Sequence, residues 1–197
     1  KVIALIQSDT FLDVAQAAAQ ADITDFDFSD MQRLIEQGEN ALEKISFLLD
    51  RGNESCFISA DEVVFHPPVI PIQYRAFSLF EDHLKNAFAQ ATKLSGIKYE
   101  IPPVWYEQPI YYKGNRLSFV GHKAEIKWPS FSEFLDIELE IAAIIGKKGR
   151  DIKKEDASNY IFGYSILNDI SARDAQMKEM PGQMGPAKSK DFDTGNV

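Results

Sequence analysis

Several protein classes are excluded by what this 197-residue sequence lacks. No wholly apolar run is longer than Ile141–Ile145, whereas a membrane-spanning helix needs about 20 apolar residues. The first seven residues are too short and too polar at their flanks for a secretory signal. A single cysteine, Cys56, cannot form an intrachain disulfide and suits a reducing compartment. We therefore predict a cytoplasmic protein with no membrane partner.

Positive charge is also in deficit, with 21 basic residues against 30 acidic ones and a net charge of −9. This balance predicts no nucleic-acid partner, because such partners bind basic surfaces. The glycine-rich motifs of nucleotide sites and the Gly-x-Ser-x-Gly turn of serine hydrolases are missing. There is no Cys/His cluster of the kind that holds zinc.

Residues 1–66 predict a small mixed N-terminal domain that is largely helical. A short helix is expected over 10–19, and a longer one from about Ser29 to Arg51. Ser29 and Gln32 have the spacing of a capping box, and Gly52 stands where a helix stop belongs. Apolar residues at helical spacing predict the buried stripe of the longer helix: Met31, Leu34, Ile35, Leu42, Ile45 and Leu49. Three prolines within 66–71 then predict a domain border after residue 66.

Residues 67–197 predict a second domain, in which a helix over 77–94 precedes short strands. Strands are expected at 110–112, 117–120, 126–128, 135–145 and 161–167. Ser171 is expected to cap a last short helix through Lys178. The fold class is therefore α+β.

The strand over 135–145 carries the first candidate site. Its alternation places Glu138 and Glu140 on one face and apolar residues on the other. Two strand positions span roughly 6.6 Å, so both carboxylates can reach one divalent cation. Asp169, at the end of another strand, could complete an oxygen-ligand site for Mg²⁺ or Ca²⁺. The alternative is an amphipathic strand with a solvated acidic face.

Two further side chains are candidates for chemistry. His83 is expected to border the buried stripe of the 77–94 helix, and it is the best candidate base of three histidines. Arg173 and Gln176 are three apart, so on a helix they share a face, where Arg173 could bind a substrate carboxylate. The alternatives are a hydrogen-bonded packing histidine and a surface arginine.

From about residue 67 onward the chain resembles the fumarylacetoacetate hydrolase family. The acidic pair followed by Asn-Asp-x-Ser-Ala-Arg-Asp, in this order, is a specific signature. The segments that carry the resemblance are 74–83, 135–140, 146–150, 163–176 and 188–194.

The resemblance implies a fold, a metal and a reaction. The fold would be a mixed β-sandwich roll, in a homodimer, and the metal would be Mg²⁺, Mn²⁺ or Ca²⁺. Its ligands would be Glu138, Glu140 and Asp169. The substrate would be a small 2-oxo or β-diketo acid, resembling fumarylacetoacetate or an acylpyruvate, whose C–C bond is hydrolysed.

The resemblance also assigns roles to other residues. His83 would activate water, and Tyr112 would line the substrate pocket. Thr194 would lie near the cation, behind its ligands. The residues that would bind substrate or stabilise enolate charge are Arg173, Gln176 and Lys190.

The sequence departs from close hydrolase relatives at three positions. Ala76 stands where they have a fourth metal-binding aspartate, and Ser78 and Met180 stand where they have tyrosines. The family's sheet also continues beyond the segment 190–194, so we expect an incomplete roll in this chain. Besides a hydrolase, the alternatives are a decarboxylase, isomerase or hydratase/dehydratase of the same family, or a non-catalytic metal-binding relative.

Overall fold

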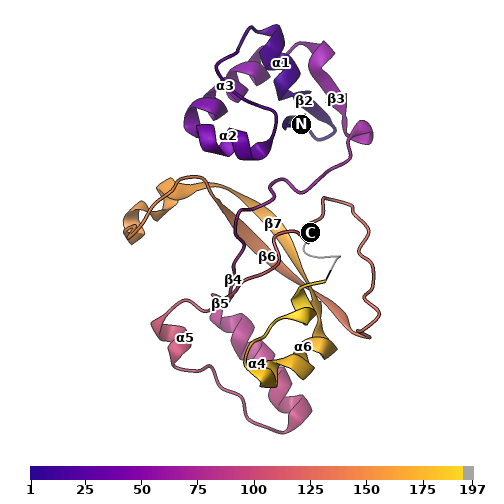
Figure 1. Ribbon diagram of the computed structural model, residues 1–197, viewed down its shortest axis with the longest axis vertical. Coiled ribbons are helices and arrows are strands. Elements are labelled where there is room, and N and C mark those ends of the chain that lie inside the picture. Colours follow the sequence, from indigo (N-terminus) through magenta and orange to yellow (C-terminus); the bar gives the residue numbers. More distant parts are fainter. Residues whose placement is uncertain (193–197) are drawn as a thin grey trace.

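Three antiparallel strands and three helices make up the N-terminal part of the chain. The computed structural model describes residues 1–192 (Figure 1). The strands pair in the order β1-β2-β3: β1 is Ile3–Gln7, β2 is Thr10–Asp13 and β3 is Phe57–Ser59. The helices are α1 (Val14–Gln20), α2 (Met31–Gln37) and α3 (Glu39–Asp50). Their apolar side chains form one core, in which Leu12, Val14 and Ala41 are fully buried.

The prediction of one long helix from about Ser29 to Arg51 is wrong, because the structure has two helices there, separated by Gly38. This residue has φ +66° and ψ −147°, a conformation that residues with a Cβ rarely adopt. The N-cap of α2 is Asp30, whose carboxylate accepts the Arg33 N–H, so the predicted Ser29 capping box is not formed. Of the residues predicted to form the buried stripe, Leu34 and Ile45 are buried, whereas Leu42 is exposed.

The predicted helix over 10–19 is shorter than expected. Residues 10–13 pair as strand β2 instead, and α1 begins only at Val14. Asp13 ends the strand and caps the helix, because its carboxylate accepts the Gln16 N–H at 3.1 Å.

A long antiparallel hairpin dominates the remainder of the chain. It consists of β6 (Leu135–Ile145) and β7 (Ile161–Ala172) and crosses the middle of the molecule (Figure 1). A second, two-stranded sheet pairs β4 (Ala76–Phe77) with β5 (Tyr111–Tyr112). The helices at this end are α4 (Glu81–Ser95), α5 (Val104–Glu107) and α6 (Arg173–Glu179). Short 3₁₀ turns are η1 (Glu54–Cys56), η2 (Ala60–Glu62), η3 (Lys154–Tyr160), η4 (Met180–Gly182) and η5 (Lys188–Lys190).

Several boundaries in this part differ from the sequence predictions. The helix expected from residue 77 begins at Glu81, because residues 76–77 pair with β5. No strand forms over 117–120 or 126–128. β7 continues to Ala172, so Ser171 lies within the strand and does not cap α6.

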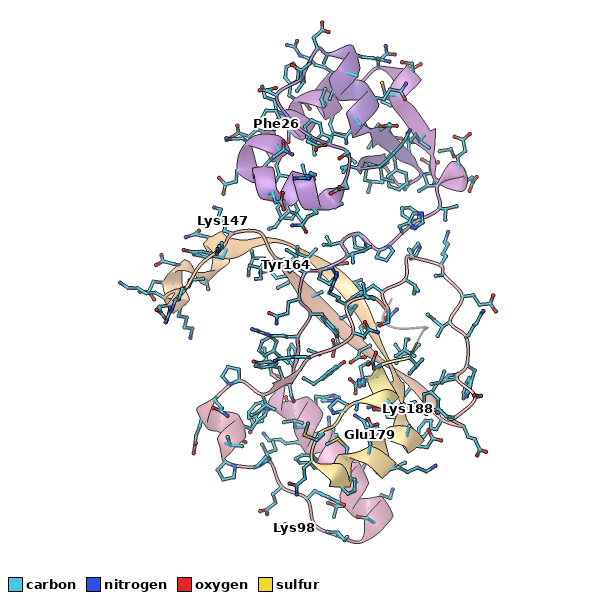
Figure 2. All side chains as sticks on the ribbon, in the orientation of Figure 1. Phe26, Lys98, Lys147, Tyr164, Glu179 and Lys188 are labelled. Atoms are coloured by element: carbon cyan, nitrogen blue, oxygen red, sulfur yellow. The ribbon has the colours of Figure 1, made fainter. Side chains whose placement is uncertain are left out.

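The two faces of the hairpin differ sharply in burial. The predicted alternation is confirmed, but the acidic face is the covered one. On the opposite face Ile137, Leu139 and Ile141 are 61%, 77% and 73% exposed. Tyr164 of β7 continues this apolar face (Figure 2). Because no sheet within residues 1–192 packs against it, the sandwich roll stays a prediction.

The N-terminal core reaches the tip of the hairpin. Phe162 of β7 packs against that core, and Lys147 lies 3.5 Å from Glu39 of α3. The domain border after residue 66 stays a prediction. None of the helices within residues 1–192 is long and apolar enough to cross a membrane.

Replacing Gly38 with alanine tests the break between α2 and α3. An added Cβ would meet no atom within 4 Å, so any cost comes from the positive φ alone. We expect the Gly38→Ala variant to lose about 1–3 kcal/mol of unfolding free energy, measured by chemical denaturation. Gly163→Ala is the control, because Gly163 has open space and no positive φ. Equal stability of the two variants would contradict this account.

Candidate metal centre

Three carboxylates converge on the covered face of the hairpin. Glu138 and Glu140 are two positions apart on β6, and Asp169 on β7 stands directly opposite Glu138. Because directly paired residues of an antiparallel sheet share a face, all three point the same way. One oxygen from each lies within 4.8 Å of the others. The structure thus brings the three predicted metal ligands together.

This cluster has unsatisfied negative charge. Asp169 is fully buried, and its Oδ1 has no hydrogen-bond partner among residues 1–192. Glu140 forms no hydrogen bond or ion pair with any described residue. Its burial, together with the Asp169 charge, raises the pKa of Glu140 to about 7. Buried carboxylates in this condition need a cation or a proton.

Two basic side chains compensate part of the charge. Arg173, the first residue of α6, donates from Nη2 to Glu138 Oε1 at 2.7 Å. Lys190 of η5 donates from Nζ to Glu138 Oε2 at 2.6 Å and to Asp169 Oδ2 at 2.7 Å. Burial alone would raise the pKa of Glu138, but the Lys190 and Arg173 charges hold it below its ordinary value.

Asp136 is a further member of the cluster that the sequence predictions missed. Its Oδ2 accepts from Nε and Nη2 of Arg173, both at 2.8 Å. The signal was available, since Asp136 precedes Glu138 by two positions and so shares its face. Gln176 accepts from Arg173 Nη1 at 3.0 Å, which places it in the same cluster.

The charge count fits a divalent cation. Within residues 1–192, four carboxylates face two basic side chains, so two negative charges stay uncompensated when all are ionised. An all-oxygen ligand set suits Mg²⁺, Ca²⁺ or Mn²⁺ and disfavours zinc. Within residues 1–192, Asp169 Oδ1 and the Glu140 carboxylate accept no hydrogen bond, so they are the oxygens most available to such an ion.

Tyr112 lies against the triad through its hydroxyl group. That hydroxyl donates to Asp169 Oδ2 at 2.6 Å, while the ring packs edge-to-face on Tyr74. Burial and the Asp169 charge raise the pKa of Tyr112, so it stays a protonated donor. Ala76 pairs with Tyr112 across strands β4 and β5. The alanine that replaces the fourth metal-binding aspartate of close hydrolase relatives therefore lies beside the site.

Two predicted site residues are not joined to the cluster. His83 lies on the first turn of α4 and is exposed, so the prediction that it borders a buried stripe is wrong. Within residues 1–192 it forms no hydrogen bond or ion pair. Thr194 lies outside the described residues, and its role stays a prediction.

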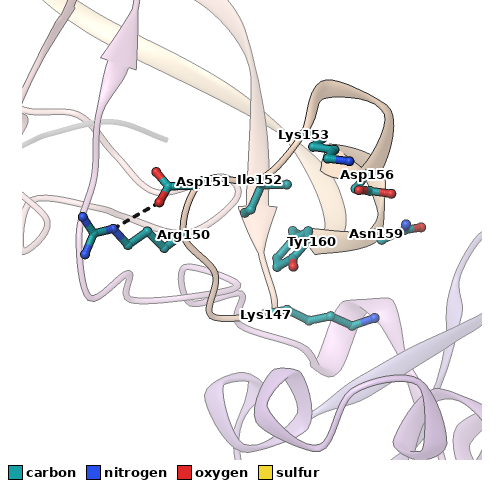
Figure 3. Close-up of a pocket in the computed structure, with 8 residues that line it drawn as sticks. All are labelled: Lys147, Arg150, Asp151, Ile152, Lys153, Asp156, Asn159 and Tyr160. Carbon is teal, nitrogen blue, oxygen red and sulfur yellow. Dashed lines mark ion pairs between the residues drawn. The ribbon is translucent and has the colours of Figure 1, made fainter.

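An open pocket lies at the other end of the hairpin and shares no residue with the triad. It has a volume of about 460 Å³ and is lined by the connection between β6 and β7 (Figure 3). Lys147, Arg150 and Lys153 contribute positive charge, but Arg150 points toward its neighbour Asp151, at 3.4 Å. The pocket therefore adds nothing to the metal centre.

The signature strands and the turn at Lys190 match a known family. The profile described as "Fumarylacetoacetate (FAA) hydrolase C-terminal" covers residues 74–197. The chain belongs to the fumarylacetoacetate hydrolase family. This confirms the resemblance found from the sequence, and the matched region contains the triad, Arg173 and Lys190.

Curated members of the fumarylacetoacetate hydrolase family carry different enzyme names. A mitochondrial oxaloacetate tautomerase of Xenopus laevis is 31% identical over 83% of this chain and 46% of its own length. A fumarylacetoacetase of Arabidopsis thaliana is 31% identical over 84% of this chain and 42% of its own length. The chain thus spans less than half the length of these relatives.

Solved structures of the family share the fold. One is a probable 2-hydroxyhepta-2,4-diene-1,7-dioate isomerase from Mycobacterium abscessus, with a TM-score of 0.63 and 23% identity. The matched region covers 98% of this chain and 57% of the chain in that structure. The other is a fumarylacetoacetate hydrolase from Exiguobacterium antarcticum, with a TM-score of 0.62 and 23% identity. The matched region covers 96% of this chain and 57% of the chain in that structure.

Asp174, the residue after Arg173, gives a pH-dependent test of how the site is held. Its carboxylate accepts the Ser132 hydroxyl at 2.5 Å and the Glu133 N–H at 3.0 Å, which ties the segment before β6 to α6. The Ser132 hydrogen bond, with that of Glu133, lowers the pKa of Asp174 to about 2. A lowered pKa stabilises the fold above the ordinary value of 3.8, and this stabilisation is lost as pH falls toward 2.

We expect Asp174→Asn to lower the thermal midpoint at pH 5–7, with a difference from wild type that shrinks as the pH falls below about 4. Asp25→Asn, at an exposed position whose side chain forms no hydrogen bond or ion pair with any described residue, should leave the midpoint unchanged. A difference for Asp174→Asn that is constant with pH would contradict the assignment.

Proposed function

We propose that this chain forms the catalytic part of a divalent-metal-dependent enzyme that acts on a small 2-oxo acid. The observation that carries the proposal is that neither Asp169 Oδ1 nor the Glu140 carboxylate has a partner within residues 1–192, with Arg173 and Lys190 in the same cluster. A divalent ion held there would polarise the adjacent oxygens of a 2-oxo acid. Glu138, Glu140 and Asp169 are the residues that would hold it.

The basic side chains of the cluster suit the charge that such a reaction develops. When a 2-oxo acid loses a proton or a carbon substituent, negative charge appears on the enolate oxygen. Arg173 and Lys190 supply two positive charges beside the triad, and Asp136 orients the Arg173 guanidinium. Besides compensating the carboxylates, these side chains would therefore stabilise the developing enolate charge.

The first candidate reaction is keto–enol tautomerisation of a 2-oxo dicarboxylic acid. The relative that is 31% identical over 83% of this chain is an oxaloacetate tautomerase, and such a reaction needs only enolate stabilisation and proton transfer. The exposed position of His83 also favours it, because no histidine lies at the triad within residues 1–192 to activate water.

The second candidate is hydrolysis of a C–C bond in a β-diketo acid such as fumarylacetoacetate or an acylpyruvate. The Arabidopsis relative of this name matches over 84% of the chain, which favours this reaction. His83 would be the base, and it would have to approach the triad from α4. A homodimer in the cytoplasm is part of either proposal.

Activity should depend on both the metal and Glu140. The assay follows the ultraviolet enol absorbance of oxaloacetate and of acylpyruvates, using the protein that carries this chain, with Mg²⁺, Mn²⁺ or EDTA. We expect EDTA to abolish turnover and Glu140→Gln to lower Mn²⁺ affinity by about 100-fold or more, measured by calorimetry. Glu155→Gln, exposed on η3, is the matched control.

The outcomes separate the candidates. Interconversion of oxaloacetate tautomers without cleavage supports the tautomerase, whereas release of pyruvate from acylpyruvates supports the hydrolase. Metal binding without turnover of either substrate would point to another branch or to a non-catalytic binder. No metal binding at all would overturn the site.

A further inference from the structure

We propose that Lys190 is the internal cation of the triad when no divalent ion is bound, and that the ion displaces it on binding. The inference rests on the proposed function, since it concerns the same site. It makes Lys190 a residue that sets metal affinity, in addition to any contact with substrate.

Lys190 occupies the position between two metal ligands. Its Nζ lies 2.6 Å from Glu138 Oε2 and 2.7 Å from Asp169 Oδ2, and its side chain is 3% exposed. These separations are slightly longer than the distance from Ca²⁺ to its oxygen ligands, which is about 2.3–2.6 Å. An ion bonded to the same two oxygens would therefore occupy the space of the ammonium group and repel its charge.

The protein anchors the turn that delivers Lys190. Glu179, the last residue of α6, accepts the Ala187 N–H at 2.7 Å, the Ser189 N–H at 3.3 Å and the Ser189 hydroxyl. Figure 2 labels Glu179 and Lys188, which mark the position of this turn. Because Ser189 is fully buried and precedes Lys190 directly, the anchor fixes the backbone from which the ammonium group reaches the triad.

The oxygens that Lys190 uses are different from those that are free. Glu138 has both oxygens engaged, by Arg173 and Lys190, and Asp169 Oδ2 also accepts from Tyr112. With Lys190 in place, the oxygens of the triad that accept no hydrogen bond from residues 1–192 are those of Glu140 and Asp169 Oδ1. A divalent ion that bound Glu138 through Oε2 would compete with Lys190 for that oxygen, and a released ammonium group would then be available to an anionic substrate.

The affinity test compares two lysines of the same turn. Lys190→Met removes the ammonium group at similar length, and Lys188→Met removes an equal charge from an exposed side chain that lies over the Phe131 ring. Calorimetry with Mn²⁺ alone should give a Kd lowered by about tenfold or more for Lys190→Met. The Kd for Lys188→Met should stay within about twofold of wild type. An unchanged or weaker affinity for Lys190→Met would overturn the inference.

A structural measurement on the unaltered protein covers the case in which Lys190→Met does not fold. Crystal structures with and without Mn²⁺ give the distances from Lys190 Nζ to Glu138 Oε2 and Asp169 Oδ2. We expect both to exceed 4 Å with Mn²⁺ bound. Distances that stay below 3 Å, with Mn²⁺ on Glu140 and Asp169 Oδ1, would refute displacement while leaving the metal site intact. Failure of the wild type to bind Mn²⁺ would instead refute the proposed function.

Discussion

The pairing register of β6 with β7 is the constraint on which the site depends. It sets Asp169 opposite Glu138 and therefore gathers their carboxylates, with those of Asp136 and Glu140, on one face of a two-stranded sheet. A shift of one residue would send Asp169 to the apolar face and separate the triad. The long, almost regular ladder of eleven paired positions makes such a shift costly.

So much negative charge on a covered face requires compensation from the rest of the chain. Arg173 lies beside the triad because β7 leads directly into α6. Lys190 lies there because the turn after α6 folds back onto the triad. Two carboxylates outside the site hold the segments that carry Arg173 and Lys190. Asp174 ties the start of α6 to the segment before β6, and Glu179 holds the turn before Lys190. The compensation is partial, which leaves the cluster suited to a divalent ion.

The same alternation that builds the site also creates the open apolar face of the hairpin. Each acidic residue on β6 has apolar neighbours in sequence, and these must point the other way. Ile137, Leu139 and Ile141 consequently remain exposed within residues 1–192. A sheet can bury both of its faces only if another layer covers each of them. The described chain covers the acidic face, but on the apolar face it covers only the end near Ile170 and Ala172.

Local patterns in the sequence were sufficient for the main elements and for the ligand set. Alternation over 135–145 predicted the strand and the shared face of Glu138 and Glu140, and the ordered motif identified the family. These features depend on neighbours along the chain, so the sequence contains them directly. The break at Gly38 was not predicted, because a glycine inside an apolar helical pattern has two interpretations until its φ is known.

Only the tertiary structure decided which face of the hairpin is covered and which side chains meet there. Alternation distinguishes two faces but does not say which of them is buried, since burial depends on what packs against the sheet. The position of Lys190 between two carboxylates and the hydrogen bond from Tyr112 to Asp169 join segments 21 and 57 residues apart. The exposure of His83 was likewise visible only in the structure. Such contacts are fixed by the path of the whole chain, and no local pattern encodes them.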